Sequence, residues 1–213
     1  MRPTKLPENL FRPLLDHDQS WLLGLIFTDG NLYSTSNTRS QRLSITSTDE
    51  DVIRKVLNIA RCGKINSRQP KYLNSKIRWD WRISSIHFDE LLSPFCITPR
   101  KSKTVQFPDI SLLSLPDFVR GLWDGDGSLR IEKSGILRSY FCSASDKFIF
   151  PLSIILNSIN DSKSIPCLCN TNNIYYLRYA SLKSKALLDW MYSGSNENNR
   201  MNRKYEIYLS INT

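Results

Sequence analysis

Two apolar runs stand out along the chain, residues 21–27 and residues 118–123, and each is followed closely by an aspartate and a glycine. These pairs are Asp29-Gly30 and Asp126-Gly127, which lie 97 positions apart (127 − 30 = 97). An apolar run that is closed by glycine is typical of a buried helix and its stop signal. The pattern therefore predicts two equivalent helices and indicates a tandem duplication.

The similarity between the two halves continues beyond these runs. Asp49 and Asp146 lie at the same spacing (146 − 49 = 97), and Arg82-Ile83-Ser84-Ser85 aligns with Arg178-Tyr179-Ala180-Ser181 at a spacing of 96. The drift of one residue indicates a deletion in a loop. Because similarity at a nearly constant spacing is the signature of an internal repeat, we expect both halves to have the same fold.

The clearest strand pattern lies in the first half. Residues 77–83 place Ile, Trp, Trp and Ile at odd positions and Arg, Asp and Arg at even positions, which predicts one buried and one charged face. The other elements expected in this half are a helix capped by Asp18 or Ser20 and ending near Thr28, strands at 31–36 and 41–47, and a helix from Thr48 to about Ala60 with Thr48 or Asp49 as its cap.

The second half predicts the same order of elements. These are strands near 128–133 and 136–143, a helix from Ser145 to about Asn157, strands near 164–169 and 174–180, and a helix from about Leu182 to Tyr192. The proline-rich residues 93–117 read as a linker between a first domain at 1–92 and a second at 118–213. We therefore expect an α+β fold of two pseudo-symmetric αββαββα repeats with antiparallel sheets.

Small residues recur within both predicted motif helices. Positions four apart share one helix face, so Gly24 and Thr28 form one stripe of small residues, and Gly121 and Gly125 form the other. Glycine inside a helix costs about 1 kcal/mol relative to alanine, and close packing is the natural compensation. We expect the two helices to pack against each other around a pseudo-twofold axis.

That packing would bring two carboxylates together, Asp29 and Asp126, at the same end of the helix pair. A carboxylate at a helix C-terminus is disfavoured by about 0.3–1 kcal/mol because it faces the negative end of the macrodipole. A divalent cation removes this conflict, and Mg²⁺ suits one or two carboxylates completed by water and phosphate. A lone Asp-Gly is more often only a turn signal, but two matched copies favour a metal site.

Charge indicates the kind of partner. The 213 residues include 29 Lys and Arg against 20 acids, a net charge of +9, which favours a polyanion. The basic residues are spread through strand-like segments, so nucleic acid is favoured over a membrane. The five cysteines are an odd set without a C-x-x-C pair, and we expect them to be core thiols: Cys62, Cys96, Cys142, Cys167 and Cys169.

The two motifs and their spacing resemble those of the LAGLIDADG homing endonucleases in their single-chain, two-repeat form, over roughly residues 15–210. The resemblance implies a monomer that makes staggered cuts in a long asymmetric duplex, leaving short 3′ overhangs. It also implies that Asp29 and Asp126 bind Mg²⁺, for which Mn²⁺ substitutes, with help from the backbone carbonyls of Thr28 and Gly125. The first motif carries Phe27 where the second carries Asp124. The resemblance implies that this position is variable in the family, so Asp124 is not assigned as a ligand.

The predicted sheets supply a DNA-binding surface. Trp79, Trp81, Tyr175 and Leu177 are expected to be buried, with the alternating polar side chains facing outward. Side chains on such a ribbon can read base edges in the major groove. The candidate DNA-binding residues are Arg39, Gln41, Arg42, Arg68, Lys71, Lys76, Arg78, Asp80, Arg82, Arg130, Lys133, Arg138, Tyr176 and Arg178.

Hydrolysis of a phosphodiester also needs positive charge near the reacting phosphate. Lys103 follows the last helix expected in the first half and Lys204 follows that of the second, at a spacing close to the repeat (204 − 103 = 101). We predict that this pair is catalytic. Neither histidine lies in a motif, so ordered or metal-bound water is the expected nucleophile.

Two other functions remain open at this level. One is an RNA-binding maturase that assists splicing of a host group I intron, and the other is a DNA-binding regulator without chemistry, which the presence of both acids disfavours. A calcium loop at 124–135 is rejected because position twelve is Gly135 instead of Glu. We expect an intracellular protein without a targeting signal or membrane segment, in a bacterial cytoplasm or in a mitochondrion or chloroplast if organelle-encoded.

Overall fold

The computed structural model describes residues 6–7, 9–11, 15–34, 40–69, 76–169 and 172–211. The first repeat contains α1 (His17–Thr28), β1 (Gly30–Ser34), β2 (Gln41–Ser47), α2 (Glu50–Ala60), β3 (Lys64–Arg68), β4 (Arg78–Ser85) and α3 (Phe88–Leu92). The second contains α4 (Leu115–Gly125), β5 (Ser128–Ile131), β6 (Leu137–Ser143), α5 (Asp146–Ile159), β7 (Cys167–Cys169), β8 (Ile174–Ala180), α6 (Ser181–Tyr192) and α7 (Asn202–Ser210). Two 3₁₀ helices, η1 (Ser93–Phe95) and η2 (Lys101–Lys103), lie between the repeats.

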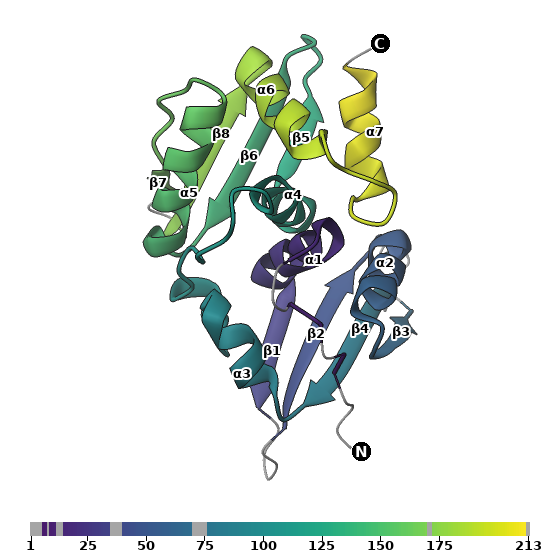
Figure 1. Ribbon diagram of the computed structural model, residues 1–213. Helices are drawn as coiled ribbons and strands as arrows, with labels where there is room; N and C mark the ends of the chain where they lie inside the picture. The colour runs from purple at the N-terminus through teal and green to yellow at the C-terminus, as the bar shows by residue number, and fades with distance from the viewer. Residues whose placement is uncertain are drawn as a thin grey trace.

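Each repeat builds one antiparallel four-stranded sheet with the same topology. The strand order is β1-β2-β4-β3 in sheet A, the sheet of the first repeat, and β5-β6-β8-β7 in sheet B, the sheet of the second. Figure 1 shows the sheets in opposite halves of the molecule, with α1 and α4 side by side between them. The predicted α+β fold of two equivalent repeats is confirmed.

The motif helices α1 and α4 approach each other closely at their glycines. A Cβ atom added at Gly24 would lie 2.2 Å from the carbonyl oxygen of Phe118, and one at Gly121 would lie 2.1 Å from that of Trp21. Such distances leave no room for a side chain, so backbone meets backbone. The predicted packing of the two motif helices is confirmed.

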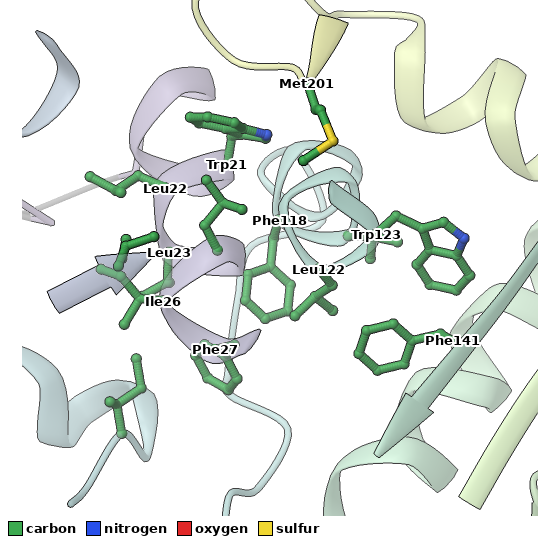
Figure 2. Packing of buried hydrophobic residues seen from close by; sticks show 14 of the residues in the cluster. Trp21, Leu22, Leu23, Ile26, Phe27, Phe118, Leu122, Trp123, Phe141 and Met201 are labelled. Carbon is green, nitrogen blue, oxygen red and sulfur yellow. The ribbon is translucent and has the colours of Figure 1, made fainter. Parts of the chain in front are cut away.

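Aromatic side chains fill the core around this helix pair. Phe27 of α1 and Phe118 of α4 make an edge-to-face contact with 5.1 Å between ring centroids, and Trp123 stacks on Phe141 of sheet B at 5.2 Å (Figure 2). Trp21 and Trp123 are almost completely buried. The helix pair therefore forms the packed contact between the two repeats.

Several local features differ from the sequence-based predictions. Helix α1 begins two to four residues earlier than predicted, because Asp16, and not Asp18 or Ser20, caps it by accepting a hydrogen bond from the backbone N–H of Gln19 at 2.7 Å. Helix α4 begins at Leu115 inside the predicted linker, with Pro116 in its first turn, a position where proline is tolerated. None of the cysteines is a core thiol; Cys167 is exposed and the other four are partly buried.

The helix α7 was not predicted. It follows a turn-rich segment after α6 and packs through an aromatic cluster in which Tyr205 and Tyr208 contact Tyr192. Its N-terminal end carries Lys204, which is buried against α4. The last helix thus reaches back to the motif helix of its own repeat.

Candidate active site

Asp29 and Asp126 occupy equivalent positions at the ends of the motif helices. Each is the C-cap of its helix, and its backbone N–H bonds to a carbonyl one turn earlier: Asp29 to Leu25 at 2.9 Å, and Asp126 to Leu122 at 3.1 Å. The glycine after each aspartate begins or precedes the first strand of its repeat. The repeated sequence therefore builds two copies of one helix-to-strand corner.

The two carboxyl groups lie close enough to affect each other. A Cβ atom added at Gly125, next to Asp126, would lie 3.3 Å from Oδ2 of Asp29 and 1.9 Å from Oγ1 of Thr28. Burial raises the pKa of Asp29 to about 7, with a further contribution from the charge of Asp126. Asp126 is more exposed than Asp29, but the protein around its carboxyl group still excludes water, and this desolvation raises its pKa too.

Two lysines face this pair of acids. Lys101 is buried and donates from Nζ to the backbone carbonyl of Gly30 at 2.5 Å. Lys204 donates to three carbonyls, those of Trp123, Asp124 at 3.0 Å and Gly127 at 2.6 Å. Gly30 and Gly127 are the equivalent glycines of the two motifs, so the lysines occupy matching sites.

Burial lowers the pKa of Lys101 to about 8, although the charges of Asp126 and Asp29 act in the opposite direction. The pKa of Lys204 is lowered for the same main reason, and Asp124, Asp29 and Asp126 oppose that shift. The two helix-to-strand corners thus bring two acids and two lysines together in one partly buried polar site.

The structure places Lys101, and not the predicted Lys103, beside the acids. Lys103 is exposed two residues further along η2, whereas Lys101 turns toward the carbonyl of Gly30. Lys204 was predicted, but Lys101 was missed because the spacing from Lys103 to Lys204 is closer to the repeat spacing than that from Lys101. The dipeptides Arg100-Lys101 and Arg203-Lys204, which share one sequence, carry the signal that identifies it.

Asp124, the acid that only the second motif carries, is buried between helices. Its Oδ2 accepts hydrogen bonds from Trp21 Nε1 and from the backbone N–H of Met201, both at 2.8 Å. Met201 is the N-cap of α7, so this carboxylate joins α1, α4 and the helix that carries Lys204. Its position agrees with leaving Asp124 out of the predicted metal ligands.

The donor set at the helix ends fits a hard divalent cation. Two carboxylates with raised pKa values converge there, and the backbone carbonyls of Gly30 and Gly127 belong to the same two corners. Mg²⁺ typically takes one or two carboxylates and fills its other positions with water and phosphate oxygens. Within the described ranges, no group of three or more His, Cys, Asp or Glu residues could hold a metal ion.

Sheet A presents a polar face with basic side chains. Arg42, Arg68, Arg78 and Arg82 lie on the outward positions of its strands, where the alternation predicts them. Lys76 is exposed just before β4. Arg39 and Lys71 lie outside the described residues.

Two candidates in sheet A differ from the prediction. Gln41 alternates in phase with Leu43 and Ile45, so it is on the core face, where it is 8% exposed and donates to Asp89 at 2.6 Å. Asp80 is on the polar face but is only 4% exposed, because the neighbouring Arg68 and Arg82 cover it. Neither side chain is presented outward.

A groove with a cavity volume of about 640 Å³ lies on the polar face of sheet B. Arg130, Arg138, Tyr176 and Arg178 all line it, and Lys133 is exposed in the β5–β6 hairpin. The guanidinium of Arg178 lies over the ring of Tyr176, 5.0 Å from its centroid. The expected burial of Leu177 holds, whereas Tyr175 and Trp79 are only partly buried.

The fold is that of solved LAGLIDADG homing endonucleases. Mesophilic variants of I-DmoI match with a TM-score of 0.55 over 85% of this chain and 97% of their own, at 20% sequence identity. I-WcaI bound to its DNA recognition sequence matches with a TM-score of 0.56 over 92% of this chain and 88% of its own, at 17% identity. An I-DmoI complex with DNA and Mn has a TM-score of 0.51 at 19% identity.

No protein-family model matches the sequence, and no curated protein matches it significantly. The chain has the single-chain LAGLIDADG homing endonuclease fold across most of its length. In the part that the structure describes, no helix is long and apolar enough to cross a membrane.

Proposed function

We propose that this protein is a site-specific endonuclease that binds a long, asymmetric duplex DNA target as a monomer and cuts both strands with a divalent metal. The observation that carries the proposal is the pairing of Asp29 and Asp126 at the ends of two closely packed helices, each with a buried lysine beside it. A need for stability does not explain two neighbouring acids with raised pKa values.

The solved structures of the same fold support the choice of substrate. I-WcaI is bound to its DNA recognition sequence, and I-DmoI is in complex with DNA and Mn. The net charge of +9 and the basic faces of both sheets suit the phosphate backbone of a duplex. The cut with short 3′ overhangs belongs to the proposal on the same basis.

Each group of the site has a role in phosphodiester hydrolysis. Asp29 and Asp126 would hold Mg²⁺, or Mn²⁺ in its place, with the backbone carbonyls of Thr28 and Gly125 as further ligands. When bound, the metal lowers the pKa of water and neutralises charge on the phosphate. Lys101 and Lys204 add positive charge where the transition state becomes more negative, and the corner around them orients the reacting phosphate.

Cleavage of plasmids that carry candidate intron-insertion sites, in Mg²⁺ buffer, tests the proposal. We expect a linear product from the plasmid that the protein binds most tightly and no product when EDTA replaces Mg²⁺. A splicing assay on a candidate host intron runs beside it. Tight, specific binding without any cut would contradict the endonuclease, and assisted splicing would then favour the RNA maturase.

A further inference from the structure

On the polar face of sheet A, a buried acid joins two arginines. Asp80 Oδ2 accepts a hydrogen bond from Arg82 Nη2 at 2.7 Å and forms an ion pair with Arg68, whose Nε lies 3.0 Å from the same oxygen. Its other oxygen accepts from Thr46 Oγ1 at 2.5 Å. Cross-strand register explains the cluster, because Thr46 of β2 lies directly opposite Asp80 of β4.

This arrangement excludes a direct role for Asp80 in reading a base. Its carboxylate is nearly completely buried, and its oxygens already accept two hydrogen bonds and pair with the guanidinium of Arg68. A cytosine amino group approaching the sheet would meet the two guanidinium groups first. The acid therefore acts on the DNA only through its arginines.

The arginines keep free donors that match guanine. Arg82 donates to Asp80 only from Nη2, and Arg68 faces Asp80 with Nε, so each guanidinium retains further N–H groups for a base. The side chain of Arg68 is 64% exposed and that of Arg82 is 31% exposed. A guanidinium with two free N–H groups can bind O6 and N7 of one guanine in the major groove.

The shared carboxylate oxygen also limits the distance between the two guanidinium groups. The nearest nitrogens of Arg82 and Arg68 lie 2.7 Å and 3.0 Å from Oδ2 of Asp80. Their separation is therefore smaller than the rise of two base pairs, each of about 3.4 Å. Two guanidinium groups held in this way can contact only the same base pair or neighbouring base pairs.

We infer that Arg68 and Arg82, positioned by Asp80, read guanine at one or two neighbouring base pairs in the half-site that sheet A contacts. This inference rests on the proposed DNA-binding function and adds a base preference to it. Asp80 is a positioning residue: it holds the arginines in a shape that fits guanine and touches no base itself.

Selection from a randomised duplex library in buffer with EDTA, which prevents cutting, tests the inference. The wild type should enrich a site with strong guanine preference at one or two adjacent positions. Asp80→Asn should weaken that preference roughly five- to 150-fold, the range typical of one bidentate contact. Its affinity for unrelated duplex should stay level or rise, since a negative charge leaves a basic face.

Two further variants separate positioning from folding. Arg82→Lys keeps the positive charge at the surface but loses the planar guanidinium with its paired donors, so this variant should also lose the guanine preference. Arg54→Lys is the matched control: Arg54 lies on α2, is as exposed as Arg68 (65% against 64%) and pairs with Glu50, so its substitution should leave the guanine preference unchanged.

The outcomes distinguish the inference from the function beneath it. Retention of the full guanine preference in Asp80→Asn, or in Arg82→Lys, would overturn the inference while leaving a site-specific DNA-binding protein. A wild type that enriches no sequence from the library would overturn both.

Discussion

Asp29 is surrounded by groups that oppose its charge and groups that favour it. Burial and Asp126 raise its pKa to about 7, and Lys204 and Lys101 act in the other direction. Because the folded pKa exceeds the ordinary value near 3.8, the folded protein binds a proton that the unfolded chain has released between those two values. The metal-free fold is therefore less stable at pH 7 than at pH 5.

We predict that the midpoint of thermal unfolding in EDTA falls between pH 5 and pH 7 and that Asp29→Asn reduces this fall. Addition of Mg²⁺ should restore stability most at pH 7, where the metal meets an ionised carboxylate. Differential scanning fluorimetry measures all three effects. An Asp29→Asn variant with the same pH profile as the wild type would rule out the proposed cause.

Lys101 and Lys103 provide a direct comparison of two neighbouring lysines. Lys101→Met removes the ammonium that is buried beside the acids, so we predict at least a tenfold loss of cleavage rate, in line with the loss of an electrostatic contact in the transition state. Lys103→Met changes an exposed side chain and should cut at nearly the wild-type rate. Single-turnover cleavage of a plasmid that the protein binds is the measurement. Equal rates for the two variants would contradict the assignment of Lys101.

Residue patterns explain which parts of the site could be predicted. The Asp-Gly repeats identify Asp29 and Asp126 because equivalent positions of the two halves lie at a nearly constant spacing. The position of the Lys101 side chain depends on the backbone conformation of η2, which the spacing of residues along the sequence does not reveal. The core position of Gln41 follows from its alternation with Leu43 and Ile45, a pattern that its polarity obscured.

At the scale of elements, the contact between α1 and α4 depends on glycine. A methyl group at Gly121 would collide with the backbone carbonyl of Trp21, which cannot move as a side chain can. We predict that Gly121→Ala destabilises the fold by about 1–3 kcal/mol or more, despite a gain of about 1 kcal/mol in helix propensity. Urea denaturation measures the change.

Gly194→Ala is the control for this substitution. A methyl group at Gly194 would meet only the ring of His17, at 3.7 Å, which is an ordinary contact. Its free energy of unfolding should differ little from that of the wild type. If Gly121→Ala were as stable as Gly194→Ala, the close helix contact would be wrong.

The elements that were predicted correctly have a strong period in the sequence. The strand β4 alternates Trp and Ile with Arg and Asp, and its observed bounds, Arg78–Ser85, follow that pattern closely. Helix α7 has no comparable apolar stripe and is held by Tyr192 and its neighbours from α6. Its existence depends on packing with a distant element, which local sequence does not reveal.

At the scale of the whole molecule, both basic sheets lie on one chain together with both motif helices. The proposed monomer should therefore bind duplex DNA without association. We predict that the logarithm of the binding constant falls linearly with the logarithm of salt concentration, with a slope of about −0.9 for each phosphate neutralised. Fluorescence anisotropy gives the slope, and sedimentation should give a single monomer species. A flat salt dependence or a stable dimer would contradict this account.

The pair of acids between the two repeats is the central feature of the molecule, and its removal separates chemistry from binding. Asp29→Asn and Asp126→Asn each remove a proposed metal ligand, while the basic faces of sheets A and B remain intact. The most direct measurement compares plasmid cleavage in Mg²⁺ with binding of the same duplex in EDTA. We predict that either variant loses double-strand cleavage and binds within a few-fold of the wild type. A variant that cuts as fast as the wild type would contradict the proposed active site.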